Sequence, residues 1–138
     1  SNGDRQYRPA HGWGGASMKL RIAVLALALS LGGCMHTGAY VIKHPGTVNQ
    51  VDDQLYDSLL TARAALESAK LQIATYPQLQ AILNTKVIPP FNALESAYLQ
   101  YHAALVAGKA ADATPLQQQV IAITAALADA LRTVGASK

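Results

Sequence analysis

The sequence has little charge and a single cysteine, and both shortages limit what the chain can be. Charged residues make up 14% of the 138 residues and hydrophobic residues 51%, which excludes a chain kept disordered by its charge. One cysteine cannot form an internal disulfide. The length suits one domain, whose stability must come from packing.

A basic surface is also missing from most of the chain. The formal net charge is +3, but the first 33 residues supply all of it, with four basic residues and one acidic residue. Residues 34–138 contain seven basic and seven acidic residues. Since nucleic-acid binding requires basic groups that neutralise phosphates, we expect no nucleic-acid partner.

The first apolar run of the sequence is too short for a typical membrane span. A span needs about 20 apolar residues, whereas residues 22–31 form a run of roughly half that length, interrupted by Ser30. The basic stretch Met18-Lys19-Leu20-Arg21 precedes this run and Gly32-Gly33-Cys34 follows it. That order predicts a cleavable secretory signal helix over residues 18–33. Residues 1–17 are interpreted as an upstream extension outside the fold.

The motif Leu31-Gly32-Gly33-Cys34 resembles the lipobox of bacterial lipoproteins, and the resemblance covers residues 18–34 only. It implies cleavage between Gly33 and Cys34, a diacylglyceryl group on the Cys34 thiol, and a fatty acid such as palmitate on the new amine. Each buried methylene contributes about 0.8 kcal/mol, so several chains anchor a protein firmly to a membrane. Two alternatives stay open: an ordinary signal cleaved near Gly33, and a retained membrane helix.

The residue after the cysteine is Met35. In enteric lipoproteins an aspartate there retains the protein at the inner membrane. The resemblance therefore implies an outer-membrane protein facing the periplasm, if the host is Gram-negative.

Residues 34–46 have no periodic pattern and contain Gly38, Pro45 and Gly46. They predict a tether between the membrane and the domain. We expect nothing to hold its two histidines, His36 and His44, in fixed positions.

Residues 47–138 show the seven-residue repeat of packed helices. The first helix is predicted to start near Thr47 or Asn49. Thr47 and Gln50 fit a capping box, and Asp52 and Asp53 suit the positive end of the helix dipole. Pro77 should end this helix. Its apolar stripe consists of Leu55, Leu59, Ala62, Leu66, Ala69, Ile73 and Tyr76.

The second helical stretch covers residues 78–107 and contains Pro89 and Pro90. Either a short helix over 78–86 precedes a new one that starts at Pro90, or one helix is kinked there; two adjacent prolines favour the break. Its stripe consists of Leu79, Leu83, Val87, Phe91, Leu94, Tyr98, Tyr101, Leu105 and Gly108.

A third helix is predicted after a turn at residues 108–113, with Thr114 as the cap and Pro115 at its first position. Gly135 should stop it. Its stripe consists of Leu116, Val120, Ile123, Leu127, Ala130 and Val134. The fold class is therefore all-α: an antiparallel, coiled-coil-like bundle of three long helices, the middle one broken or kinked at Pro89-Pro90.

No catalytic, metal-binding or phosphate-binding motif is present in the sequence. We expect no enzyme, no metal and no cofactor. One helix face groups Glu95, Tyr98, Tyr101 and His102. It is interpreted either as a binding face or, as the simpler hypothesis, as core tyrosines beside a solvated His102.

The sequence thus predicts a lipid-anchored helical protein of the cell envelope with a structural or protein-interaction role. Its thin, alanine-rich core is compatible with self-association or with an envelope protein partner. One alternative is a small-ligand module with a pocket lined by Phe91, Tyr98 and Tyr101. Another is linkage to the cell wall through Lys138, because murein lipoproteins of enteric bacteria combine a lipidated cysteine, heptad helices and a terminal lysine.

Overall fold

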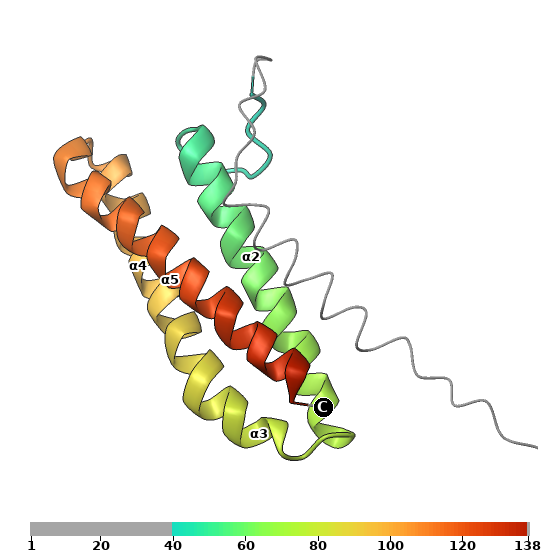
Figure 1. Cartoon of the computed structure of the whole chain (residues 1–138). Helices are drawn as coiled ribbons and strands as arrows, with labels where there is room; N and C mark the ends of the chain where they lie inside the picture. The colour runs from blue at the N-terminus through green and yellow to red at the C-terminus, as the bar shows by residue number, and fades with distance from the viewer. Residues whose placement is uncertain (1–39, 138) are drawn as a thin grey trace, which may run out of the picture.

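The computed structural model describes residues 40–137, and these form helices and turns without any strand. Three long helical segments lie side by side and alternate in direction (Figure 1). They are α2 (Gln50–Leu71), α4 (Ile88–Val106) and α5 (Ala110–Ala136). The shorter elements are η1 (Gln72–Ala74), α3 (Leu79–Ile82) and η2 (Leu83–Val87), which connect α2 to α4. The all-α class is confirmed, while the predicted signal helix lies outside the described residues.

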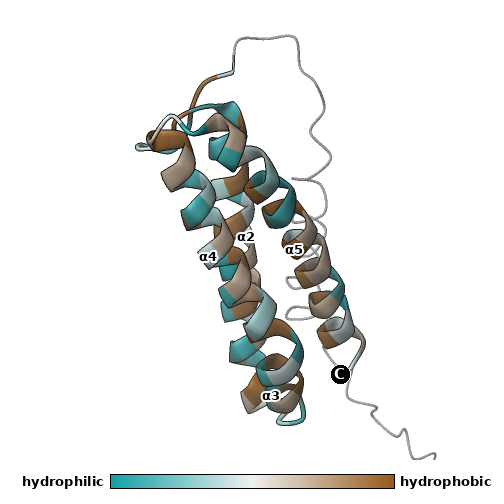
Figure 2. Cartoon of the chain, turned by 90° about the vertical axis from the view of Figure 1, so that its left-hand side faces the viewer, coloured by the Kyte–Doolittle hydropathy of each residue, from teal (hydrophilic) through white to brown (hydrophobic). Residues whose placement is uncertain are grey.

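One hydrophobic core is shared by the three segments. Hydrophobic and hydrophilic residues alternate along each helix (Figure 2), as expected for helices that bury one face. The largest fully buried hydrophobic side chains are Tyr101, Leu79, Leu83, Leu94, Leu127, Leu131, Val87, Val120 and Val134.

The start of α2 differs from the predicted capping box. Asn49 is the cap, and its side chain accepts a hydrogen bond from the backbone N–H of Asp52 at 3.0 Å. The Thr47 hydroxyl instead bonds to the His44 carbonyl oxygen at 2.8 Å. Of the two predicted starts, Asn49 is therefore the correct one. The predicted stripe is buried from Leu55 to Ala69.

The middle segment is one continuous helix rather than two. A π-helical stretch, η2, joins α3 to α4, and the Ile88 N–H donates to the Leu83 carbonyl five residues earlier. A proline ring clashes with the carbonyl four residues before it, and a π turn widens the backbone at that point. Pro89 and Pro90 then lie at the start of α4 without breaking the helix.

The turn between α4 and α5 is centred on Gly108, whose φ is +70°. Gly108 N–H donates to the Leu105 carbonyl at 2.9 Å and Lys109 N–H to the Ala104 carbonyl at 2.9 Å, which closes α4 with a Schellman motif. The chain has already reversed direction at this turn. The helix α5 can therefore begin at Ala110, and it includes Pro115. The prediction that Thr114 caps the third helix is wrong.

The buried face of α5 is also shifted from the predicted stripe. Thr124 and Leu131 are fully buried, whereas Ile123 and Ala130 are only partly buried. The helix includes Gly135 and ends one residue later. Its length and composition would allow it to cross a membrane, but core helices pass the same test, and α5 packs against the core.

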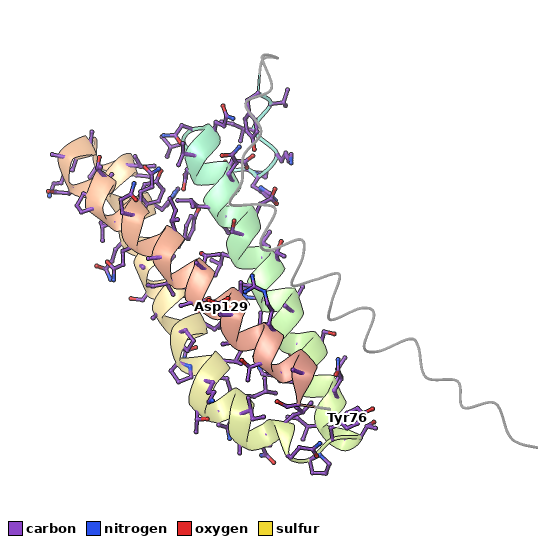
Figure 3. All side chains as sticks on the ribbon, in the orientation of Figure 1. Tyr76 and Asp129 are labelled. Atoms are coloured by element: carbon purple, nitrogen blue, oxygen red, sulfur yellow. The ribbon has the colours of Figure 1, made fainter. Side chains whose placement is uncertain are left out.

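Different segments of the chain form the two ends of the bundle. The start of α2 and the α4–α5 turn lie at one end (Figure 1). Tyr76 marks the opposite end (Figure 3), where the Gln78 amide lies 3.5 Å from the Ser137 carbonyl oxygen. The described chain thus enters the bundle at one end and leaves it at the other.

Candidate functional site

Two adjacent carboxylates at the start of α2 are fully buried. Asp52 and Asp53 each have 0% exposure. The positive end of the helix dipole favours negative charge there. Burying a carboxylate still costs several kcal/mol unless hydrogen bonds compensate it, so its partners explain why it is buried.

Asp53 binds the segment that precedes α2. Its Oδ2 accepts from the Tyr40 hydroxyl at 2.6 Å and from the Lys43 N–H at 3.0 Å. Its Oδ1 accepts from the His44 N–H at 2.9 Å and from the Thr47 hydroxyl at 3.2 Å, and lies 2.8 Å from His44 Nδ1. All five groups belong to residues 40–47, so one carboxylate holds this segment against the helix.

Asp52 connects the same corner to α4. Its Oδ2 accepts from the Val48 N–H at 2.8 Å and lies 2.8 Å from His102 Nδ1. Its Oδ1 accepts from the Tyr98 hydroxyl at 3.0 Å. We call Tyr40, His44, Thr47, Asp52, Asp53, Tyr98 and His102 the carboxylate cluster. It links the segment before α2, the first turn of α2 and the end of α4.

Aromatic rings extend through the cluster. His44 meets the ring of Tyr56 edge-on at 5.0 Å, and Tyr56 lies 5.6 Å from Tyr98. Tyr98 stacks with His102 at 6.0 Å. Such ring contacts add to the area that the side chains bury, so the cluster combines polar bonds with packing.

His44 lies between two carboxylates. Its Nδ1 contacts Asp53, and its Nε2 is 3.3 Å from Asp57 Oδ1. Lys43 Nζ lies 3.5 Å from the other Asp57 oxygen.

The surroundings fix the charge of these groups. Burial alone would raise the pKa of Asp53, but hydrogen bonds from Tyr40, Lys43 and His44 outweigh it and hold the pKa well below its usual value of 3.8. The hydrogen bond to Asp53 raises the pKa of Tyr40 to about 12. Burial, together with the Asp52 charge, raises the pKa of Tyr98. An ionised Asp53 beside a neutral Tyr40 phenol is therefore the favoured state near neutral pH.

This geometry suits a structural role. We call the bonds by which Asp53 holds residues 40–47 against α2 the clasp. Both oxygens of Asp53 are occupied by donors from the chain itself, and a satisfied buried network rigidifies the elements that it joins. Within residues 40–137, no group of three or more His, Cys, Asp or Glu side chains has an arrangement that could hold a metal ion.

The structure divides the predicted binding face. Tyr98 and His102 converge on Asp52, while Tyr101 is buried in the core with its ring 6.5 Å from that of Tyr98. The hypothesis of core tyrosines is correct for both rings. His102, however, is bonded to a carboxylate rather than simply solvated.

Glu95, the fourth residue of the predicted binding face, does not contact Asp52. It forms an ion pair with Arg63 of α2 instead. Gly33, Cys34 and Lys138 lie outside the described residues.

Sequence reasoning missed the carboxylate cluster. The prediction that nothing would hold His44 is wrong, because Asp53 binds both its backbone and its ring. The helix dipole explains acidic residues at positions 52 and 53, but it predicts neither their burial nor their partners. The available signal was the run of hydrogen-bond donors Tyr40, His44 and Thr47 shortly before two adjacent aspartates.

Fold and site together define a small all-helical domain whose first segment is fastened to the bundle by buried carboxylates. No protein-family model, curated protein or solved structure matches the chain.

Proposed function

We propose that the protein is a lipid-anchored helical protein of the bacterial cell envelope with a structural or protein-interaction role and without catalysis. The observation that carries the proposal is the lipobox-like motif ending at Cys34, directly after a basic and then apolar stretch. The fold is compatible with the proposal, because the described residues, which start six positions after Cys34, form a packed helical bundle.

The proposed location is the outer membrane, facing the periplasm, in a Gram-negative host. Met35 after the cysteine supports it, by resemblance to enteric lipoproteins. The clasp fits a tethered domain, since it fastens the membrane-proximal chain to the bundle through Asp53.

Labelling with radioactive palmitate in a Gram-negative host tests the anchor. The wild type should incorporate label and partition into detergent, while Cys34→Ser should lose both properties. Met35→Ser, one residue away, is the matched control and should keep the label. Membrane association of a correctly cleaved Cys34→Ser protein would contradict the proposal.

The sorting proposal has its own variant. Met35→Asp should keep the label but move the protein from the outer to the inner membrane in a density gradient. An unchanged distribution would contradict the outer-membrane assignment and leave lipidation standing.

A further inference from the structure

The end of the bundle at which the described chain begins exposes most of the large apolar side chains that the described residues leave in solvent. We call it the anchor-side end: residues 40–51 and the α4–α5 turn at residues 106–109. Of seven exposed large hydrophobic side chains in the described part of the chain, five lie here: Val41 (76% exposed), Ile42 (45%), Val48 (46%), Val51 (36%) and Val106 (66%). Of the other two, Leu99 lies about two turns before the end of α4 and Leu71 lies at the far end of α2. Figure 2 shows the hydrophobic stretch that leads into α2.

These apolar residues are held in place. The Lys43 N–H and the His44 N–H bond to Asp53, directly after Val41 and Ile42. The Val48 N–H bonds to Asp52, and the Schellman bonds at Gly108 fix the turn that follows Val106. These hydrogen bonds fix the backbone next to the exposed apolar side chains.

The anchor cannot be far from this surface. Residues 35–39 are all that separate Cys34 from Tyr40, and a fully extended chain spans at most about 3.6 Å per residue. Tyr40 thus stays within about 22 Å of the Cys34 backbone. A lipid on Cys34 would keep the anchor-side end close to the bilayer and leave Leu71 and Ser137 at the distant end.

The charges at this end do not favour a strongly charged partner. Asp52 and Asp53 are buried, and Lys43 lies close to Asp57. Lys109 and Asp112 stand three residues apart at the start of α5. The exposed charges, Lys43 with Asp57 and Lys109 with Asp112, are matched in sign, and exposed apolar side chains beside them suit the boundary between lipid headgroups and acyl chains.

We infer that the anchor-side end rests on the bilayer interface, with Val41, Ile42 and Val106 in contact with lipid and the helices directed away from the membrane. This inference rests on the proposed lipidation. At 1.5 Å per residue, the 27 residues of α5 would carry its C-terminal end about 40 Å from that contact.

Fluorescence quenching by lipids tests the contact in the full lipidated protein. A lipidated Cys34 has no free thiol, and the chain contains no other cysteine, so Val106→Cys or Leu71→Cys adds a single labelling site. Both positions are exposed and apolar, at opposite ends of the bundle. Each variant is labelled with an environment-sensitive dye and reconstituted in phosphatidylethanolamine and phosphatidylglycerol vesicles that contain a spin-labelled lipid.

Dye at position 106 should be quenched at least twofold more than dye at position 71, and Val41→Cys should behave like Val106→Cys. Equal quenching at both ends of a vesicle-bound protein would overturn this inference alone. A dye at 106 that is shielded from water yet not quenched would overturn it in favour of a second copy or another protein. If the purified protein carries no lipid and leaves the vesicles, both this inference and the proposed function fail.

Discussion

At the scale of single residues, Asp52 and Asp53 of the carboxylate cluster bind different parts of the chain. Asp53 holds residues 40–47, which are near in sequence, whereas Asp52 reaches Tyr98 and His102, 46 and 50 residues away. Adjacent carboxylates on a helix start point in different directions. One pair of residues therefore serves both local and long-range contacts.

Replacing Asp53 by asparagine should destabilise the domain by about 2–4 kcal/mol, because the amide cannot accept from all the donors that face the carboxylate. Urea unfolding followed by circular dichroism measures this. Asp129, exposed on α5 and paired with Arg132 (Figure 3), provides the control: Asp129→Asn should change stability by less than about 0.5 kcal/mol. Equal effects of the two substitutions would show that the Asp53 bonds contribute nothing special.

Acid should destabilise the domain through the same group. The pKa of Asp53 is lowered in the folded protein from its usual 3.8, so the unfolded chain takes up the proton first as the pH falls. The stability that Asp53 contributes is present above about pH 4 and is lost as the pH falls below it. Unfolding free energies at pH 6 and pH 3 should differ less for Asp53→Asn than for the wild type. An identical pH dependence in both proteins would refute the bonding described for Asp53.

At the scale of helices, apolar periodicity predicted the elements well and their junctions poorly. The stripe from Leu55 to Ala69 is buried as predicted, because heptad spacing determines which face packs. Of the two alternatives at Pro89-Pro90, the favoured break is wrong and the continuous helix is correct. The cap predicted at Thr114-Pro115 is wrong. In both places, local cap and breaker signals compete with packing. The π turn keeps the middle helix continuous, and the hydrogen bonds at Gly108 close α4 just before α5 begins. The local sequence does not predict either outcome.

The Gly108 turn can be tested directly. Gly108→Ala should cost about 1 kcal/mol, because φ of +70° is unfavourable for a residue with a Cβ. An added Cβ would meet no atom within 4 Å, so backbone strain is the only cause expected. Gly108→Asn should lose less, since asparagine tolerates this conformation better. Thermal unfolding separates the two, and a larger loss for asparagine would contradict the account.

At the scale of the whole molecule, the bundle could be predicted from sequence but the site could not. Residues 40–46 lack periodicity and suggested a tether, yet Tyr40 and His44 bond to Asp53. An apolar stripe appears in the sequence as a regular repeat. Hydrogen-bond partners that come together from separate elements produce no such repeat. For the same reason the sequence predicts that Tyr98 and His102 share a helix face, but not that both bond to Asp52.

The clasp should be measurable as a property of the domain. A fragment that starts at Tyr40 should be more stable than one that starts at Thr47 by at least about 2 kcal/mol, because the shorter fragment leaves Asp53 buried without Tyr40 and His44. Both should be mostly helical by circular dichroism. Equal stability in urea would show that residues 40–46 act only as a tether.

The most direct test of the central claim is the mass of the N-terminal tryptic peptide of the mature protein. Trypsin cuts after Lys43, so lipidation and cleavage predict a peptide of residues 34–43 that carries a diacylglyceryl group and an amide-linked fatty acid on Cys34. An unmodified peptide that starts at another residue, or the uncleaved peptide of residues 22–43, would contradict the account.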